Sequence, residues 1–292
     1  MRPHFPFFLQ ATAGLLTAAA FFNLSLPPSA EQLTHLAPVI QDATEPAVLI
    51  TADAAATNPD APSRVSRAAP EPVEPIVIEH GLRDEKAVAL TFDACSTRQP
   101  SEYDERVTQV LTSTGTPATL FLGGKWMQEQ PEHTKRLAAN PLFEIGNHTF
   151  LHPHLREISE DHIRRELQAT QDILDSLTGR RATLFRPPYG EYDERAVRIA
   201  ASLGLRTVQF DLASGDPDPA IGHDRLIQYV SSMARNGSII VMHVNRLGRH
   251  TADALPAIIF RLRQRGFVFR TVSDLLHLPT RPDSATNILE HN

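Results

Sequence analysis

Residues 87–93 read AVALTFD, an apolar run that ends in a carboxylate and is typical of a buried strand leading into a polar loop. Further short apolar runs follow it, and segments with helical periodicity lie between them. Strands that alternate with helices predict a parallel sheet, either covered on both faces or closed into a barrel. About seven such units in roughly 200 residues fit an α/β barrel slightly short of the eight-unit form. The expected strands are Ala87–Phe92, Ala118–Leu122, Phe143–Gly146, Thr183–Phe185, Thr207–Phe210, Ser238–Met242 and Phe267–Arg270.

The clearest helical pattern spans Ser159–Thr178. Its apolar residues, from Ile163 to Leu177, recur at helical spacing on one face, and Gly179 is a typical stop signal. The same pattern, again closed by a glycine, is found in three further segments: Tyr192–Leu203, Arg225–Ala234 and Ala252–Arg265. We expect these helices to cover the sheet.

Segments of different composition flank this globular zone. Residues 1–30 contain no Asp, Glu, Lys or Arg after Arg2, which indicates a secretory signal peptide or an uncleaved N-terminal membrane anchor. Residues 31–75 are rich in Ala, Pro, Thr and acidic residues and show no sustained period, so we expect a disordered linker. The folded domain is expected over residues 76–280, with a flexible tail over 281–292.

Composition narrows the function classes. The chain has 292 residues, of which 41% are hydrophobic and 21% charged, so collagen-like, coiled-coil and wholly disordered proteins are excluded. A net charge of −6 and the lack of a long basic run argue against a nucleic-acid partner. Cys95 is the only cysteine, so neither an intramolecular disulfide nor a cysteine-based zinc cluster can form.

Polar residues follow one strand after another. In parallel α/β folds the carboxyl ends of the strands meet on one face, and the chemistry takes place there. Carboxylates, imidazoles and a guanidinium on one such face are not needed for solubility, but a metal-assisted or acid–base site needs them. These residues are Asp93, His148, His152, Arg186, Asp211, Asp216, Asp218 and His243.

His148 and His152 are candidate metal ligands, because neutral imidazole is a common ligand of Zn²⁺, Co²⁺ and Ni²⁺. Their spacing of four suits one face of a helix or a tight turn, and Pro153 favours the turn. The alternative is a chance spacing in a chain with 13 histidines. A secure catalytic zinc site needs a third protein ligand.

Asp93 and His243 are candidates for acid–base chemistry. Arg186, in a loop stiffened by two prolines, could pair with Asp93 and keep it ionised. Asp211, Asp216 or Asp218 could orient His243 and raise its pKa, making it an acid near neutral pH. The structural alternatives are a helix cap or turn residue for Asp93 and a buried core histidine for His243.

The segments TFDA, NHTFLH, RPPYG, FDLASGD and VMH, taken in this order, resemble the polysaccharide deacetylases of the NodB-homology group, carbohydrate esterase family 4, over roughly residues 88–276. The resemblance implies a deformed (β/α)7 barrel and a divalent metal, with zinc expected first and cobalt or nickel as alternatives. It also implies hydrolysis of acetyl groups, above all N-acetyl groups of N-acetylglucosamine units. The implied partner is an acetylated polysaccharide: peptidoglycan, a chitin-like polymer or an exopolysaccharide.

Matching the motifs assigns a role to each residue. Asp93 resembles the general base, and Arg186 resembles the residue that positions it. The backbone N–H of Tyr189 resembles part of the oxyanion hole. His243 resembles the general acid, with Asp216 as its orienting carboxylate. His148 and His152 resemble the metal ligands.

One departure from the family pattern bears on the metal. The family has a second aspartate after the base, which ligates the metal, and this chain has Ala94 there. The third contact then comes from Asp93, from water or from the Cys95 thiolate, or the metal binds weakly or not at all. This keeps a second hypothesis open, a catalytically weakened or inert carbohydrate-binding relative. The segment before the linker and the substrate class predict a secreted or periplasmic protein, either released or anchored to the inner membrane.

Overall fold

Every expected strand is present in the computed structural model, which describes residues 71–97 and 99–278. Two short strands were not expected, β1 (Val77–Ile78) and β7 (Leu212–Ala213), since two residues are too few to show a period. The other strands are β2 (Ala87–Ala94), β3 (Ala118–Leu122), β4 (Phe143–Asn147), β5 (Leu184–Phe185), β6 (Arg206–Val208), β8 (Ser238–His243) and β9 (Val268–Phe269).

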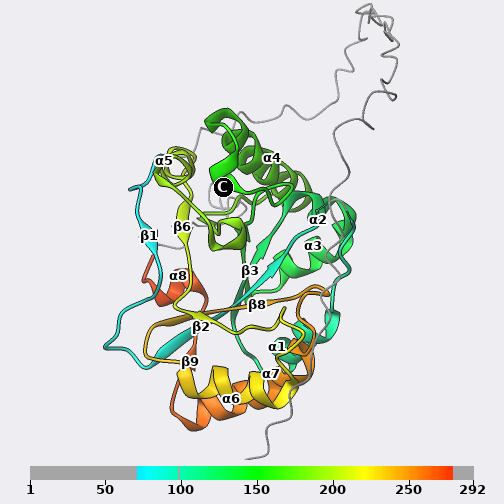
Figure 1. The fold of residues 1–292 in the computed structure, drawn as a ribbon, viewed down its shortest axis with the longest axis vertical. Helices are drawn as coiled ribbons and strands as arrows, with labels where there is room; N and C mark the ends of the chain where they lie inside the picture. The colour runs from blue at the N-terminus through cyan, green and yellow to red at the C-terminus, as the bar shows by residue number, and fades with distance from the viewer. Residues whose placement is uncertain (1–70, 98, 279–292) are drawn as a thin grey trace, which may run out of the picture. The chain divides into compact units, whose positions relative to one another are not determined.

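All ladders between these strands are parallel, as the alternation of strands and helices predicts. The strand order is β1-β6-β5-β4-β3-β2-β8-β7, and β9 pairs with β2 beside this path. Within the described residues β1 and β7 form opposite edges of the sheet. The expected deformed barrel is therefore confirmed as a curled half-barrel that stays open between these edges (Figure 1).

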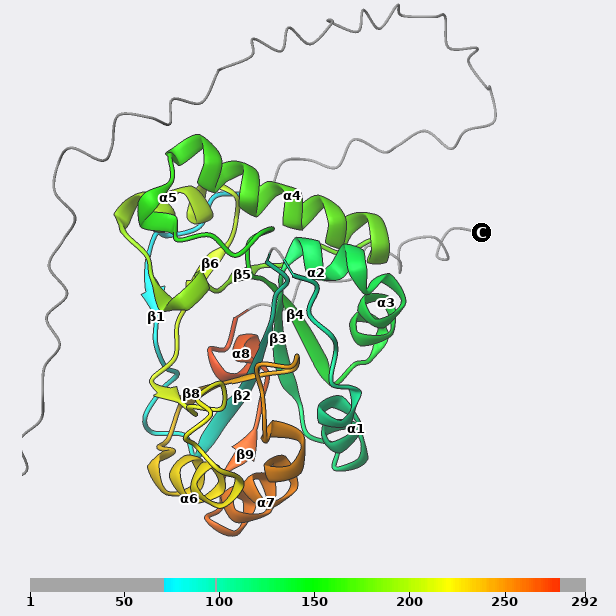
Figure 2. The ribbon, with the colours of Figure 1, turned by 45° about the vertical axis from the view of Figure 1, so that its right-hand side comes forward.

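Helices pack around the curled sheet. Figure 2 shows α4 and α5 along one side and α6 and α7 along the opposite side. Ser159 and Asp193 cap α4 and α5 with their side chains, and Gly179 ends α4 with a φ of 70°, as its position predicted. The helices are α1 (Glu105–Ser113), α2 (Gly124–Glu129), α3 (Pro131–Ala139), α4 (Glu160–Thr178), α5 (Glu194–Ser202), α6 (His223–Met233), α7 (Thr251–Gln264) and α8 (Val272–Leu275).

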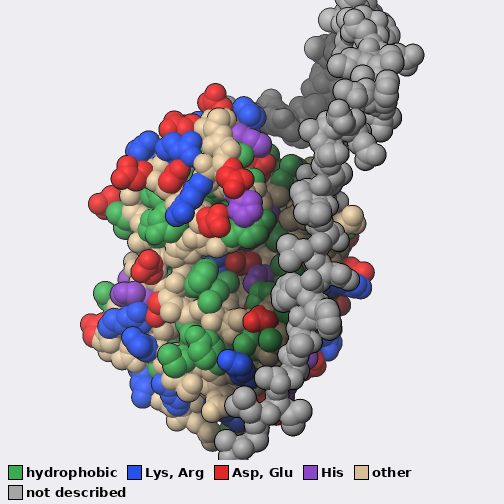
Figure 3. Space-filling model, viewed as in Figure 1, with side chains coloured by type: hydrophobic (Ala, Val, Ile, Leu, Met, Phe, Trp, Pro, Cys, Tyr) green, Lys and Arg blue, Asp and Glu red, His purple; other side chains and the backbone are tan. Residues whose placement is uncertain are grey.

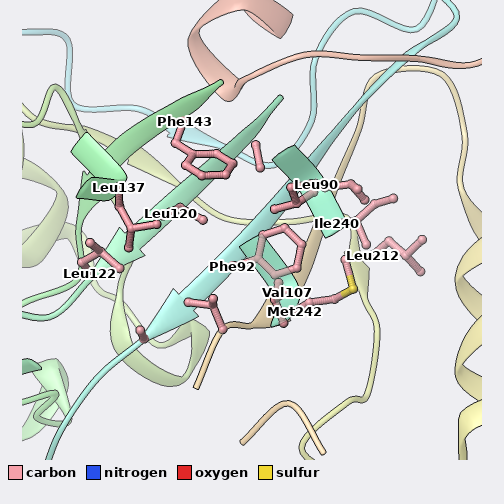
Figure 4. Packing of buried hydrophobic residues seen from close by; sticks show 14 of the residues in the cluster. Leu90, Phe92, Val107, Leu120, Leu122, Leu137, Phe143, Leu212, Ile240 and Met242 are labelled. Atoms are coloured by element: carbon pink, nitrogen blue, oxygen red, sulfur yellow. The ribbon is translucent and has the colours of Figure 1, made fainter. Parts of the chain in front are cut away.

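The alternation of side chains along β2 separates the core from the site. Leu90 and Phe92 belong to the large apolar cluster that includes helix residues such as Val107 (Figure 4). Ala87 and Ala89 belong to a second, smaller cluster. Because successive side chains of a strand point to opposite faces, Thr91 and Asp93 share the face of this second cluster. The sequence of β2 thus buries one face under helices and directs Asp93 to the other.

The surface carries charges of both signs. Figure 3 shows acidic and basic side chains interspersed over one face, with hydrophobic side chains grouped near its centre. Among the described residues no helix combines the length and the apolar character that crossing a bilayer requires. The expected signal or anchor over residues 1–30, most of the linker over 31–75 and the tail over 281–292 lie outside the described residues.

Candidate active site

Strand register brings the candidate residues to one place. Asp93 on β2 is paired in register with His243 on β8. On the other side of β2, Asn147 at the end of β4 is paired with Phe185 at the end of β5. His148 and Arg186 each follow one of these paired residues directly, so the polar residues predicted at separate strand ends meet at one end of the sheet.

Asp93 and Arg186 form a buried ion pair. Arg186 is fully buried, Asp93 is 6% exposed, and Arg186 Nη1 lies 2.9 Å from Asp93 Oδ1. The guanidinium also donates to Thr91 Oγ1 at 2.7 Å and to the Gln209 carbonyl at 3.1 Å, and it lies over the Phe121 ring. These contacts fix its plane toward the carboxylate.

The ion pair decides the charge of Asp93. Burial alone raises the pKa of a carboxyl, because water stabilises the ionised form. The positive charge of Arg186, together with His148, His243 and the Arg186 hydrogen bond, outweighs burial and lowers the pKa of Asp93 below its usual value. Asp93 is therefore an ionised carboxylate at neutral pH, with Oδ2 outside the Arg186 contact.

His148 and His152 lie together in a turn after β4, as Pro153 predicted. Their ring centroids are 4.9 Å apart and their planes meet at 68°. His148 Nδ1 lies 2.8 Å from the Arg186 carbonyl oxygen. A carbonyl can only accept, so Nδ1 carries the proton and Nε2 keeps its lone pair. Nε2 is 3.8 Å from Asp93 Oδ2.

Both imidazoles are held in the neutral form. Burial lowers the pKa of His148, and burial lowers the pKa of His152 to about 3. His152 Nδ1 is buried and has no hydrogen-bond partner among the described residues. Neutral imidazoles with a free nitrogen suit a divalent metal.

The third ligand that a catalytic zinc site needs is not formed. Ala94 is fully buried and belongs to the large apolar cluster. Burial and the charge of Asp93 raise the pKa of Cys95 to about 12, which keeps it a thiol rather than the thiolate that zinc takes. Across residues 71–97 and 99–278, no three His, Cys, Asp or Glu side chains are grouped to hold a metal ion. The donors present fit a metal through two nitrogens and do not complete a three-ligand site.

His243 is paired with one of its three candidate aspartates. Its Nδ1 lies 2.9 Å from Asp216 Oδ1, and its backbone N–H donates to Asp216 Oδ2 at 2.8 Å. Asp211 instead accepts from Arg83 and from the start of β8, and Asp218 caps its own turn.

Asp216 is itself held in place, being 1% exposed and accepting from Thr251 and Ser214. Burial lowers the pKa of His243, but the hydrogen bond and charge of Asp216 outweigh it, so the pKa is raised. The pair thus favours the charged imidazolium.

Tyr189 stands at the rim of the site in a left-handed turn. Its φ is 57°, and Gly190 follows with a φ of 68°. The Tyr189 ring is 53% exposed, lies 4.1 Å from the parallel His154 ring and contacts the His152 ring at 4.4 Å. Gln209 Nε2 donates to the Gly190 carbonyl at 2.7 Å, and this turn is thereby linked to Arg186, which donates to the Gln209 carbonyl.

Some residues of this arrangement were not found from the sequence. Thr91 could have been found, because it lies two positions before Asp93 on the same face of β2. Gln209, Glu166 and His154 had no such signal, since each acts through a contact with a residue distant in the chain.

Comparisons with known proteins agree with the resemblance of the motifs. The family model for polysaccharide deacetylase matches residues 80–208. A peptidoglycan-N-acetylmuramic acid deacetylase of Bacillus subtilis is 30% identical over 199 residues, 67% of this chain and 73% of that protein. A peptidoglycan-N-acetylglucosamine deacetylase of Bacillus cereus is 32% identical over 197 residues, 67% of this chain and 70% of that protein.

Solved structures include enzymes and a pseudoenzyme. A CE4 family pseudoenzyme from Bacillus anthracis is 28% identical with a TM-score of 0.64, covering 70% of this chain and 69% of that one. A mutant of it, described as having restored enzymatic activity, is 29% identical with a TM-score of 0.63, covering 70% and 72%. The fold therefore occurs in relatives with and without activity, which makes the side chains of the site decisive.

Proposed function

This chain belongs to the polysaccharide deacetylase family, and from that premise we propose that it removes acetyl groups from an envelope or extracellular polysaccharide. The bond cleaved is the N-acetyl amide of N-acetylglucosamine-type units, and the products are acetate and the free sugar amine. The observation that carries the proposal is the pairing of an ionised Asp93 with a charged His243 on neighbouring strands. A base and an acid held in opposite protonation states are what amide hydrolysis by water requires.

Each residue then has a distinct task. Asp93, held ionised by Arg186, takes a proton from the water that attacks the acetyl carbonyl. The backbone N–H of Tyr189 donates to the oxygen that becomes negative in the tetrahedral intermediate. His243, charged through Asp216, gives its proton to the sugar nitrogen as the C–N bond breaks.

His148 and His152 would hold a divalent metal, with Zn²⁺ expected first and Co²⁺ or Ni²⁺ as alternatives. Asp93 would be a further oxygen donor to such an ion, which would polarise the acetyl carbonyl and make water more acidic. Independently of the ion, burial keeps both rings neutral, and His148 Nε2 lies 3.8 Å from Asp93 Oδ2.

Acetate release from acetylated chitin oligomers and from peptidoglycan tests the proposal. We expect release by the wild-type protein with added Zn²⁺, Co²⁺ or Ni²⁺, and at least a ~100-fold loss in Asp93→Asn, because the base is removed. No release from any of these substrates, at any added metal, would contradict the enzymatic function.

Metal analysis tests the role of the histidines. After loading with Zn²⁺ and removal of excess metal, we expect bound zinc in the wild type and its loss in His148→Ala. His223→Ala is the control, because His223 is exposed and pairs with its neighbour Asp224. A stoichiometry near zero in the wild type would remove the metal from the proposal.

A second candidate is carbohydrate binding without turnover. Ala94 in place of an acid and the similarity to a pseudoenzyme favour it. It predicts that the protein binds acetylated oligosaccharides and releases no acetate. The enzymatic function is preferred because binding alone has no use for the Asp93–Arg186 and His243–Asp216 pairs together.

Export is part of the same proposal, since acetylated envelope polymers lie outside the cytoplasm. We propose that residues 1–30 direct the protein to the periplasm or the exterior, either cleaved or retained as an inner-membrane anchor. Fractionation of cells that produce the full chain, beside a variant lacking residues 2–30, tests this. Recovery of the full chain in the cytoplasm would contradict it.

A further inference from the structure

The turn that carries the two histidines has an unusual backbone. Thr149 and His152 have φ values of 61° and 57°, a region that residues with a Cβ adopt rarely. Such conformations persist only where surrounding groups impose them. The closeness of the His148 and His152 rings depends on this backbone, because His152 itself is one of the two left-handed residues.

One side of the turn is held by the start of α2. The Gly124 N–H donates to the Thr149 carbonyl at 2.9 Å, and the Lys125 N–H donates to the Phe150 carbonyl at 3.1 Å. A Cβ at Gly124 would lie 2.3 Å from Phe150 Cδ2, so only glycine permits this approach. These contacts satisfy two carbonyl groups of the turn. The Thr149 N–H donates to Asn147 Oδ1, and the Phe150 and Leu151 N–H groups are left to another partner.

That partner is a carboxylate on α4. Glu166 Oε2 accepts from the Phe150 N–H at 2.8 Å and from the Leu151 N–H at 2.7 Å. Glu166 is 5% exposed, so these are buried, charge-assisted hydrogen bonds to two of the three residues between the histidines, beside the strained positions. His162 Nε2 lies 3.6 Å from Oε1, the other carboxylate oxygen.

We propose that Glu166 is a positioning residue for the metal-binding turn: its carboxylate holds the Phe150–Leu151 backbone and thereby makes the His148 and His152 rings converge. The role of Glu166 in bringing the rings together is inferred from the contacts above. Its effect on metal binding rests on the proposed function. Groups that orient metal ligands in this way typically change metal affinity by about 10–100-fold when they are lost.

The test compares substitutions at Glu166 with a matched control on the same helix. Glu166→Leu removes both acceptors, Glu166→Asp keeps the charge but lacks the reach, and Glu166→Gln keeps an accepting oxygen. Gln171→Leu is the control, because Gln171 is also buried on α4 and also makes two hydrogen bonds to backbone, those of Ala182. Its loss lowers stability without touching the turn.

Two measurements separate positioning from stability. The first is the nuclear Overhauser effect between the ring protons of His148 and His152 in metal-free protein. The centroids of these two rings lie 4.9 Å apart. The second is the Zn²⁺ dissociation constant from competition with a chelator. We expect Glu166→Leu and Glu166→Asp to lose the ring contact and weaken Zn²⁺ binding by about 10–100-fold. Glu166→Gln and Gln171→Leu should keep both.

The outcomes are distinct from those of the deacetylase proposal. A retained ring contact with wild-type Zn²⁺ affinity in Glu166→Leu and Glu166→Asp would overturn the positioning role. If Gln171→Leu lost the ring contact and Zn²⁺ affinity to the same extent, the effect of Glu166 would be one of general stability. If Glu166→Gln lost them, an accepting oxygen at this position would not be enough to hold the turn. If the wild type binds no Zn²⁺, the metal part of the proposed function fails, and the ring contact still decides the role of Glu166. If Glu166→Leu does not fold, the comparison of Glu166→Asp with Glu166→Gln tests the positioning role of Glu166.

Discussion

His148 and His243 both lie beside a carboxylate, yet their pKa values shift in opposite directions. His148 Nε2 is 3.8 Å from Asp93, whose other oxygen is engaged by Arg186, and burial lowers the pKa of His148. His243 Nδ1 is 2.9 Å from Asp216, and this bond outweighs burial and raises the pKa of His243. A nearby carboxylate is therefore not enough to charge an imidazole; the carboxylate must be free to accept its hydrogen bond.

The difference also divides the chemistry. A neutral imidazole with a lone pair can bind a metal, and a charged imidazolium can donate a proton. Burial produces most of the division, because it lowers the pKa of His148, and the charge of Arg186 adds to this effect. Four experiments test this contrast.

The largest effect is expected from Asp216→Asn. The asparagine leaves the shape of the pair but removes the charge that stabilises the His243 imidazolium, so acetate release should fall by about 10²–10⁴-fold in kcat/KM. Steady-state kinetics at neutral pH measure this. Asp218→Asn is the control, because Asp218 is exposed and does not contact His243. Equal activity of the two variants would show that Asp216 does not act through His243.

Arg186→Met should destabilise the fold by about 3–5 kcal/mol at neutral pH, since it leaves Asp93 buried without its cation. In the wild type the pKa of Asp93 is lowered, so its ionised form stabilises the fold above the ordinary aspartate range and this stability is lost as the pH falls. In the variant, burial raises the pKa of Asp93, so Asp93 becomes neutral as the pH falls. The loss of stability caused by the substitution therefore becomes smaller at low pH. Urea unfolding across the pH range measures the difference in unfolding free energy between the wild type and the variant. A difference that stays constant with pH would contradict the assignment of a negative charge to Asp93.

The pH dependence of kcat/KM should have two limbs. Activity falls at low pH as Asp93 becomes protonated, below the usual aspartate range because its pKa is lowered. It falls at high pH as His243 loses its proton, above the usual histidine range because its pKa is raised. Asp216→Asn should move the alkaline limb toward lower pH and leave the acid limb in place. If Asp216→Asn shifted the acid limb instead, the assignment of base to Asp93 and acid to His243 would have to be exchanged.

The smallest effect concerns a partly buried carboxylate. Glu144 on β4 accepts from Thr119 and Ser273, and burial raises its pKa. A raised folded-state pKa means that its contribution to stability is complete below the ordinary glutamate range and declines as the pH rises through the folded value. Glu144→Gln can keep the same partners without charge.

We therefore expect Glu144→Gln to match the wild type at low pH and to exceed its stability at neutral pH by about 1 kcal/mol or less, a size typical of one modest pKa shift. Chemical unfolding at two pH values measures this. A variant that is less stable at neutral pH would mean that the ionised carboxylate makes stronger hydrogen bonds there than its burial costs.

Much of the site could be predicted because chemistry and strand ends coincide in the sequence. Asp93, His148, Arg186 and His243 each follow an apolar run, and parallel pairing brings them together. The choice of Asp216 over Asp211 and Asp218 could not be made from spacing. It depends on Thr251 and Ser214, which hold Asp216 beside His243.

The amino-acid sequence by itself determined the parallel α/β architecture, the order of the polar strand ends and the family, because periodicity and short motifs are local properties. The fold had to be known to see that the half-barrel stays open, that Asp216 pairs with His243, and that Glu166 contacts the histidine turn. The physical reason is that these outcomes depend on burial and on hydrogen bonds between residues far apart in the chain. Local sequence sets which groups are available, and three-dimensional packing sets which of them become partners and which carry charge.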